Sequence, residues 1–178
     1  MAKDKHIEMW SLDECHFQQH GSRCAMWIPP EDKDPTVMHA PTRKSMALFG
    51  AVNIQSGKFL HMTSSVFNAV TFGEFLAKLI KRRTRNKRMV IILDNARYHH
   101  AVLLHPWLKK YRESIGLLFL PPYSPDLNPI ERVWKLTRRL CTHNQYFPDL
   151  SMLIEKVSAR MYQWSKPNQQ LQKLCCII

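Results

Sequence analysis

Hydrophobic and polar residues alternate near the start of the chain with the period of two that is typical of β-strands. Residues 7–17 contain no turn residue, so this segment is predicted to be a strand that places Asp13 and Glu14 on opposite faces. Gly, Ser and Pro residues delimit three further apolar runs, which are predicted to be strands at residues 23–28, 44–54 and 58–62. The four strands are expected to form consecutive antiparallel hairpins.

Beyond residue 70 the apolar positions take the spacing of amphipathic helices. This spacing predicts helices at residues 71–83, 99–113, 129–141 and 149–164. Pro106 is expected to break or delay the second of them. Short apolar runs at residues 89–93 and 117–120 are typical of strands buried on both faces. The pattern predicts an α/β domain at residues 1–165, in which helices cover both faces of a mixed sheet, and a tail at residues 166–178 without an assigned element.

The charge of the chain indicates an anionic partner. Its 178 residues include 26 Lys and Arg against 14 Asp and Glu, which gives a formal net charge of +12. Nucleic acid is the commonest such partner, and a role in solubility is the alternative. No apolar run approaches the ~18 residues of a membrane span, and the first residues lack the apolar core of a signal peptide. Five cysteines without a C-x-x-C pair favour neither a disulfide framework nor a zinc site, so a cytoplasmic location without a membrane partner is expected.

Residues 120–134 combine a rigid loop with the start of a helix. The loop is stiffened by four prolines, Pro121, Pro122, Pro125 and Pro129. Asn128 is predicted to be the N-cap, with Pro129 at the first helical position and Glu131 at the third. Glu131 is then either the acid of a capping box, which only satisfies a backbone donor, or a functional carboxylate that the rigid loop holds in place.

Three acidic residues occupy positions suited to chemistry: Asp13 within the first strand, Asp94 at the end of a buried strand, and Glu131 at a helix start. Each also has a purely structural alternative. Asp13 could be an exposed residue of an edge strand, Asp94 could form an Asx-turn or a helix cap, and Glu131 could belong to a capping box. If they converge, three carboxylates would hold two Mg²⁺ ions, which can activate a water or a 3′-hydroxyl for attack on a phosphodiester. His99 and His100 are expected either to line this site or to begin a helix, and a histidine-based zinc site is not favoured.

Basic residues that could contact DNA phosphates form two groups, one within a single eight-residue stretch and one on the helix that carries Glu131. They are Lys81, Arg82, Arg83, Arg85, Lys87, Arg88, Arg132, Lys135, Arg138 and Arg139. The first group could equally be a solvated helix end or a nuclear localisation signal. Arg138 and Arg139 could instead complement the negative end of the helix dipole.

Two motifs resemble the catalytic core of the IS630 and Tc1/mariner transposases, a group of DDE endonucleases. They are Leu93-Asp-Asn-Ala-Arg-Tyr-His-His100 and Leu120-Pro-Pro-Tyr-Ser-Pro-Asp-Leu-Asn-Pro-Ile-Glu131. The strand around Trp10-Ser-Leu-Asp-Glu14 is similar to the first catalytic strand of that family. The second motif is long and highly specific, and the 36 residues between Asp94 and Glu131 are close to the usual interval of the family. The resemblance covers about residues 7–141.

This resemblance implies an RNase H-like fold, in which a mixed five-stranded sheet of three antiparallel strands followed by parallel strands is flanked by helices. It implies that Asp13, Asp94 and Glu131 are the catalytic triad and hold two Mg²⁺ ions, for which Mn²⁺ can substitute. Such enzymes hydrolyse DNA at the transposon ends and then join the freed 3′-hydroxyl to target DNA, typically at TA. The implied partners are therefore DNA and either a second copy of the chain or a full-length transposase, at a nucleoid-associated location. Glu14 is expected to point away from the triad, and Asp126 to be structural.

Family members carry an N-terminal helix-turn-helix region that recognises the terminal inverted repeats, whereas about six residues precede the first predicted strand here. The chain is therefore expected to be an isolated catalytic domain that lacks this region. Metal-dependent cleavage and strand transfer is the favoured function. A truncated, non-catalytic DNA-binding or regulatory fragment and a different RNase H-like nuclease are the alternatives.

Overall fold

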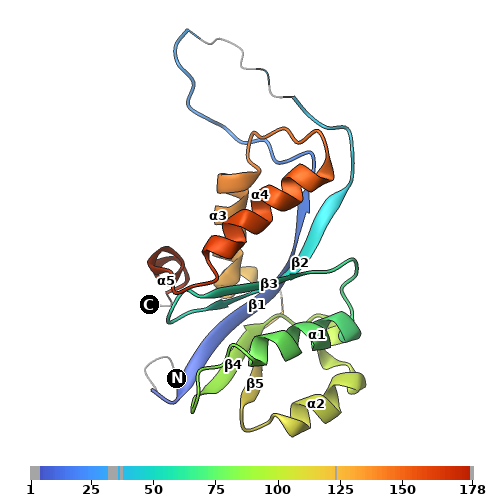
Figure 1. Ribbon diagram of the computed structural model, residues 1–178, viewed down its shortest axis with the longest axis vertical. Coiled ribbons are helices and arrows are strands. Elements are labelled where there is room, and N and C mark those ends of the chain that lie inside the picture. Colours follow the sequence, from blue (N-terminus) through green and yellow to red (C-terminus); the bar gives the residue numbers. More distant parts are fainter. Residues whose placement is uncertain (1–4, 32–35, 37, 123, 177–178) are drawn as a thin grey trace.

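The computed structural model describes residues 5–31, 36, 38–122 and 124–176. Its centre is a five-stranded sheet with the strand order β3-β2-β1-β4-β5 (Figure 1). The strands are β1 (Ile7–Gln18), β2 (Ser45–Asn53), β3 (Phe59–Thr63), β4 (Arg88–Leu93) and β5 (Ile115–Phe119). The first three pair antiparallel, whereas β4 pairs parallel to β1 and β5 parallel to β4. The predicted mixed sheet of three antiparallel strands followed by parallel ones is confirmed.

Helices cover both faces of the sheet (Figure 1). On one face, α1 (Ala69–Ile80) and α2 (His105–Lys110) pack over a core that includes Trp10 and Leu12 of β1. On the other face, α3 (Ile130–Cys141), α4 (Leu150–Gln163) and α5 (Gln169–Cys175) pack over a core that includes Cys15 and Phe17. Successive residues of β1 therefore contribute to different cores. No helix in the described part of the chain is long and apolar enough to cross a membrane.

Trp134 determines how closely α3 approaches the sheet. Its side chain is buried, and its ring makes edge contacts with the rings of Phe17 and Phe59. A Cβ atom at Gly50 would overlap the Trp134 ring, so only a residue without a side chain permits this packing. Gly50 pairs with Asp13 across β1 and β2. The contact therefore brings α3 against the part of β1 that carries Asp13.

The strand predicted at residues 23–28 is wrong. In the described part of the chain these residues form no strand, and Trp27 is fully exposed. The adjoining Ser22 makes only an isolated bridge to His143. β2 and β4 pair with β1 on its two sides, which leaves no place for a further strand next to it. A local apolar run does not form a strand without a backbone partner.

The helix predicted at residues 99–113 is divided into three short segments. These are η1 (Arg97–His100), η2 (Val102–Leu104) and α2, the first two being 3₁₀ helices. Ala101 between them has an extended backbone with φ −62° and ψ 135°. Pro106 lies in the first turn of α2, so the expectation that it delays the helix is confirmed.

The C-terminal segment, for which no element was predicted, forms α5. Leu171 and Cys175 of α5 are buried in the same core as α3 and α4. Nη1 of Arg132 in α3 donates a 3.0 Å hydrogen bond to the backbone oxygen of Leu174. Only seven residues long, this helix shows too few turns for its apolar spacing to stand out in the sequence.

Candidate active site

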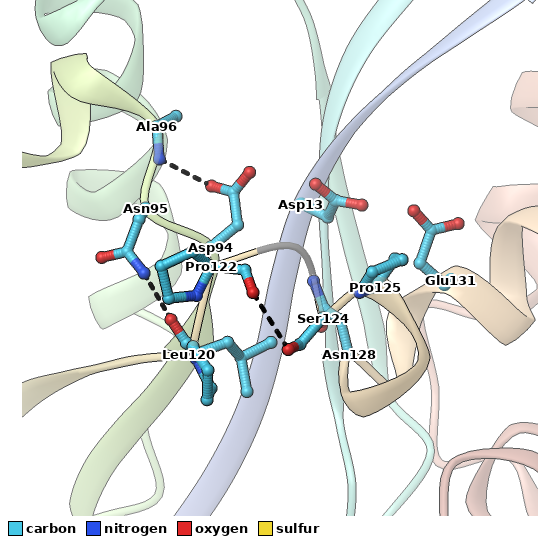
Figure 2. Close-up of a pocket in the computed structure, with 11 residues that line it drawn as sticks. Asp13, Asp94, Asn95, Ala96, Leu120, Pro122, Ser124, Pro125, Asn128 and Glu131 are labelled. Atoms are coloured by element: carbon cyan, nitrogen blue, oxygen red, sulfur yellow. Dashed lines mark hydrogen bonds between the residues drawn. The ribbon is translucent and has the colours of Figure 1, made fainter.

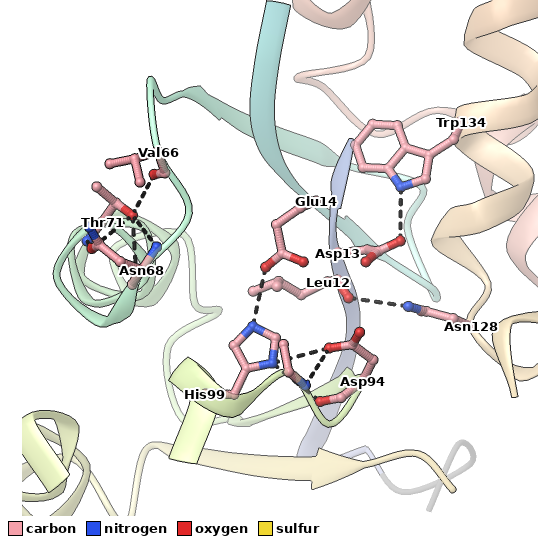
Figure 3. Close-up of polar contacts among 11 residues, drawn as sticks. Leu12, Asp13, Glu14, Val66, Asn68, Thr71, Asp94, His99, Asn128 and Trp134 are labelled. Carbon is pink, nitrogen blue, oxygen red and sulfur yellow. Dashed lines mark hydrogen bonds and ion pairs between the residues drawn. The ribbon is translucent and has the colours of Figure 1, made fainter. Parts of the chain in front are cut away.

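Asp13 lies within β1 on the face that α3 covers. Its Oδ2 accepts a 3.2 Å hydrogen bond from Nε1 of Trp134 (Figure 3). Burial raises the pKa of Asp13 to about 8, and the negative charges of Glu14 and Glu131 act in the same direction. Among the described residues, Asp13 has no basic ion-pair partner. A half-buried carboxylate in this position would be stabilised by a bound cation.

Asp94 follows directly after β4, on the strand next to Asp13. The parallel pairing of β1 with β4 ends at Ser11 and Ile92, and the two acids lie two residues beyond this pair. The Asp94 side chain is 54% exposed. Its Oδ1 accepts a 3.1 Å hydrogen bond from the backbone N–H of Ala96, which is the Asx-turn considered as the structural alternative. The turn occupies one carboxylate oxygen and does not exclude a ligand at the other.

Glu131 lies in the first turn of α3, at the end of the proline-rich loop. The predicted side-chain N-cap at Asn128 is wrong, because the Asn128 side chain bonds to β1 instead. Its Oδ1 accepts from the Ser11 hydroxyl, and its Nδ2 donates to the Leu12 backbone oxygen at 3.3 Å. The Ser11 hydroxyl in turn accepts a 3.0 Å hydrogen bond from the backbone N–H of Ile130, so a residue of β1 caps the helix. Among the described residues, no hydrogen bond to the Glu131 carboxylate supports the capping box that was the structural alternative.

The three acids line one cleft of about 470 Å³. In Figure 2, Asp13 lies between Asp94 and Glu131, and the carboxylates of all three project to the same side. The oxygens of the three acids do not all lie within 4.8 Å of one another. The rest of the lining comes mainly from the loops after β4 and β5: Asn95, Ala96, Leu120, Pro121, Pro122, Ser124, Pro125 and Asn128. The arrangement is an open row of carboxylates with a rigid wall, rather than a closed single-ion cage.

The comparison with known families decides the identity of the domain. The family model of the DDE superfamily endonucleases matches residues 8–154, a range that contains all three acids and most of the sheet. The chain belongs to the DDE superfamily endonuclease family. The fold agrees with this assignment, since it is the RNase H-like fold of the Mos1 transposase catalytic domain. The two structures compare with a TM-score of 0.63 and 16% sequence identity, over 98% of this chain and 78% of that chain.

Relatives of this DDE endonuclease include bacterial and animal proteins. An uncharacterised protein of Sinorhizobium fredii is 32% identical over 73% of this chain and 90% of its own length. The Tc1 transposase of Caenorhabditis elegans is 29% identical over 76% of this chain and 52% of its own length. The Mos1 transposase in a paired-end complex has a TM-score of 0.70 and 17% identity over 98% of this chain and 53% of that chain. The DDE domain thus spans about half the length of these two transposases.

A second polar group in the DDE domain was not predicted from the sequence. His99 is buried and contacts Glu14 from β1 on one side and Asp94 on the other. Glu14 lies on the opposite face of β1 from Asp13, as predicted, but it does not point away from the whole triad, because ligand atoms of Glu14 and Asp94 lie within 4.8 Å of each other and both acids contact His99 (Figure 3). Spacing along the chain gave no signal for this contact, because Glu14 and His99 are 85 residues apart. Asp126 is exposed and does not line the cleft.

The predicted DNA-contacting residues are not gathered around the acids. Residues 81–88 lie at the start of β4, whereas Asp94 follows its end. On α3, Arg132 bonds to α5 and the tail, and Nη2 of Arg138 lies 3.2 Å from Sγ of Cys15. Lys135 and Arg139 are exposed and bond to no other described residue. The second basic group thus divides into two residues that are held by the protein and two that face solvent.

Proposed function

We propose that this domain is the metal-dependent catalytic core of a transposase, which cleaves DNA strands and joins a 3′-hydroxyl to target DNA. The observation that carries the proposal is that Asp13, Asp94 and Glu131 reach one cleft from three separate elements. Carboxylate oxygens are the ligands that Mg²⁺ and Mn²⁺ prefer. An acidic cleft on a chain of net charge +12 suits the binding of a phosphodiester next to metal ions.

The donor set supports two cations rather than one. Asp13 lies between the other two acids, and the three do not converge on one point (Figure 2). Asp13, Asp94 and Glu131 would together hold these ions. Two such ions, when bound, would stabilise both the attacking and the leaving oxygen of a phosphodiester.

The protein itself would hold these carboxylates before any cation binds. The indole N–H of Trp134 orients Asp13, and the Ser11 hydroxyl joins the start of α3 to β1. Glu131 therefore cannot move independently of the strand that carries Asp13. Because the pKa of Asp13 is raised to about 8, cation binding must displace a proton near neutral pH.

The proposed substrates and partners follow from solved structures with the same fold. The Mos1 structures include a paired-end complex with the left transposon end, a strand transfer complex, and paired-end complexes with Mn and with Mg. For this chain we propose transposon-end DNA and TA-containing target DNA as substrates, and either Mg²⁺ or Mn²⁺ as the cation. A second copy of the chain or a full-length transposase is the proposed protein partner, in a nucleoid-associated complex.

Nicking of supercoiled plasmid DNA tests the proposal. The wild-type domain should nick the plasmid with Mg²⁺ or Mn²⁺ and not with EDTA. Asp94→Asn should abolish nicking while DNA binding persists, because the amide keeps the Asx-turn acceptor but loses the charge. Asp126→Asn, which changes an exposed acid of the neighbouring loop, is the matched control and should nick normally. DNA binding by the wild type without nicking in either metal would contradict the proposal and favour a non-catalytic fragment.

A further inference from the structure

His99 connects two carboxylates that come from different strands. Its Nδ1 lies 3.2 Å from both the backbone oxygen and Oδ1 of Asp94. Its Nε2 lies 3.2 Å from Oε1 of Glu14. Figure 3 shows the imidazole between the two acids, with Glu14 reaching it from β1. The side chain of His99 is 1% exposed and that of Glu14 13%, whereas that of Asp94 is 54% exposed, so the buried imidazole reaches from the core to an acid at the surface of the cleft.

The groups around His99 allow its ring only one orientation. A carbonyl oxygen can only accept, so Nδ1 carries a hydrogen and donates toward Asp94. The ring centroid lies 4.3 Å from that of Phe72 and 4.5 Å from that of Tyr98, which confines the imidazole plane. Rotation of the ring would break the contact with Glu14 and the contact with Asp94 together.

The consequence for Asp94 is a fixed carboxylate. Asp94 is the exposed member of the three acids, and an exposed side chain must lose rotamer freedom when it binds a cation. Its Oδ1 is held by the N–H of Ala96 at 3.1 Å and approached by Nδ1 of His99. With Oδ1 engaged by two donors, the other oxygen remains for a ligand in the cleft.

A separate metal site at Glu14, Asp94 and His99 is the alternative, since one ligand atom from each lies within 4.8 Å of the others. The two ring nitrogens of His99 point in opposite directions, however, and each already faces one of the acids. An ion at either nitrogen would replace one of these contacts. The geometry is that of a hydrogen-bonded chain.

We propose that His99 is a positioning residue that holds Asp94 for its cation, and that Glu14 holds His99 from the opposite face of β1. This inference rests on the proposed metal-binding function of Asp94. It assigns Glu14 a role that does not require it to be a ligand. Partners that orient a metal ligand in this way commonly change metal affinity 10–100-fold when they are removed.

Two isosteric substitutions separate positioning from a merely structural role. An Asn side chain places an amide nitrogen where Nδ1 of His99 lies, whereas Gln places one where Nε2 lies. His99→Asn should retain most of the Mn²⁺ affinity of the metal-free domain, measured by electron paramagnetic resonance. His99→Gln and His99→Ala should weaken it roughly 10-fold or more. Urea unfolding of each variant without metal verifies that it is folded, and His100→Gln, a change at the exposed neighbour, should bind as the wild type does.

The role of Glu14 is tested by a double-mutant cycle. Glu14→Ala should weaken Mn²⁺ binding more in the wild-type background than in the His99→Ala background, because only the wild type loses the support of the imidazole in addition to a nearby negative charge. Additive losses, or equal losses in His99→Asn and His99→Gln, would overturn the inference. Failure of the wild type to bind Mn²⁺, or unchanged binding by Asp94→Asn, would instead overturn the proposed metal site and the role of His99 with it.

Discussion

The indole Nε1 of Trp134 donates a 3.2 Å hydrogen bond to Oδ2 of Asp13. This bond joins the helix that carries Glu131 to the strand that carries Asp13, and it is made by a buried indole to a half-buried carboxylate. The packing of the Trp134 ring on Gly50 fixes the position of the donor. One side chain thus serves both the core and the candidate active site.

A Trp134 variant that keeps an aromatic ring but lacks the N–H should separate packing in the core from the hydrogen bond to Asp13. Trp134→Phe should lower Mn²⁺-dependent nicking about 10-fold or more, because a hydrogen bond to a charged group contributes ~1.5–3 kcal/mol. The initial rate of plasmid nicking measures the effect. Trp164→Phe makes the same chemical change in the same core, away from the carboxylates, and should nick at close to the wild-type rate. Equal losses of activity in the two variants would refute a specific role of the Trp134 donor.

The raised pKa of Asp13 predicts how stability depends on pH. Asp13 titrates near 3.8 in the unfolded chain and at about 8 in the fold, so the native state binds more protons between these values. The free energy of unfolding of the metal-free domain should therefore fall as pH rises from about 4 to 8, by at most ~1.4 kcal/mol per pH unit from this group. Urea unfolding in EDTA at several pH values measures the slope.

Asp13→Asn supplies the control for this titration. The variant should show a shallower pH dependence and should exceed the wild type in stability at pH 8 without metal. Mn²⁺ should stabilise the wild type increasingly as pH rises toward 8 and should have little effect on the variant. An identical pH dependence of the two proteins would show that burial of Asp13 is not its cause.

The mixed sheet and the positions of the three acids within their elements could be predicted because each acid lies next to a recognisable local pattern. The alternation around Asp13, the apolar run before Asp94 and the prolines before Glu131 all lie within a few residues of the acid concerned. The strand predicted at residues 23–28 failed because strand formation requires a backbone partner, which local hydrophobicity cannot reveal. The division of the helix predicted at residues 99–113 was only partly visible, through Pro106.

The hydrogen bonds that support the site could not be predicted, because they join residues far apart in the sequence. Ser11 and Ile130 are 119 residues apart, and Glu14 and His99 are 85 residues apart. Asn128 shows the difficulty directly. Its position before a helix is typical of an N-cap, yet its side chain bonds to β1, and Ser11 supplies the cap from another element.

Loss of the Ser11 hydroxyl should therefore affect both stability and metal binding. Ser11→Ala leaves the N–H of Ile130 and the side-chain oxygen of Asn128 without their partner in a buried site. This should lower the free energy of unfolding by ~1–3 kcal/mol. Mn²⁺ affinity should fall as well, because the start of α3 is no longer held to β1. Ser65→Ala, at an exposed position, is the control, and a stable Ser11→Ala variant would show that the cap is dispensable.

The basic residues of α3 give a prediction about DNA. Lys135 and Arg139 follow Glu131 at intervals of four residues, so the three share one side of the helix. Both are exposed, and a DNA backbone that enters the cleft at Glu131 could continue along them. Replacing both with Gln should weaken DNA binding and reduce the slope of log affinity against log salt concentration by about 2, which fluorescence anisotropy in a salt series measures.

A matched pair of variants decides whether this effect is local. Lys109→Gln with Lys110→Gln removes the same charge from exposed positions on α2, on the opposite face of the sheet. If DNA follows α3, this control pair should leave the salt dependence close to that of the wild type, whereas the Lys135 and Arg139 pair should not. Equal changes in both would mean that net charge alone attracts DNA. The same comparison can be made with Lys81→Gln and Arg82→Gln, which lie at the other end of β4 from Asp94. If these residues also contact the DNA, the two substitutions should lower the slope by a similar amount.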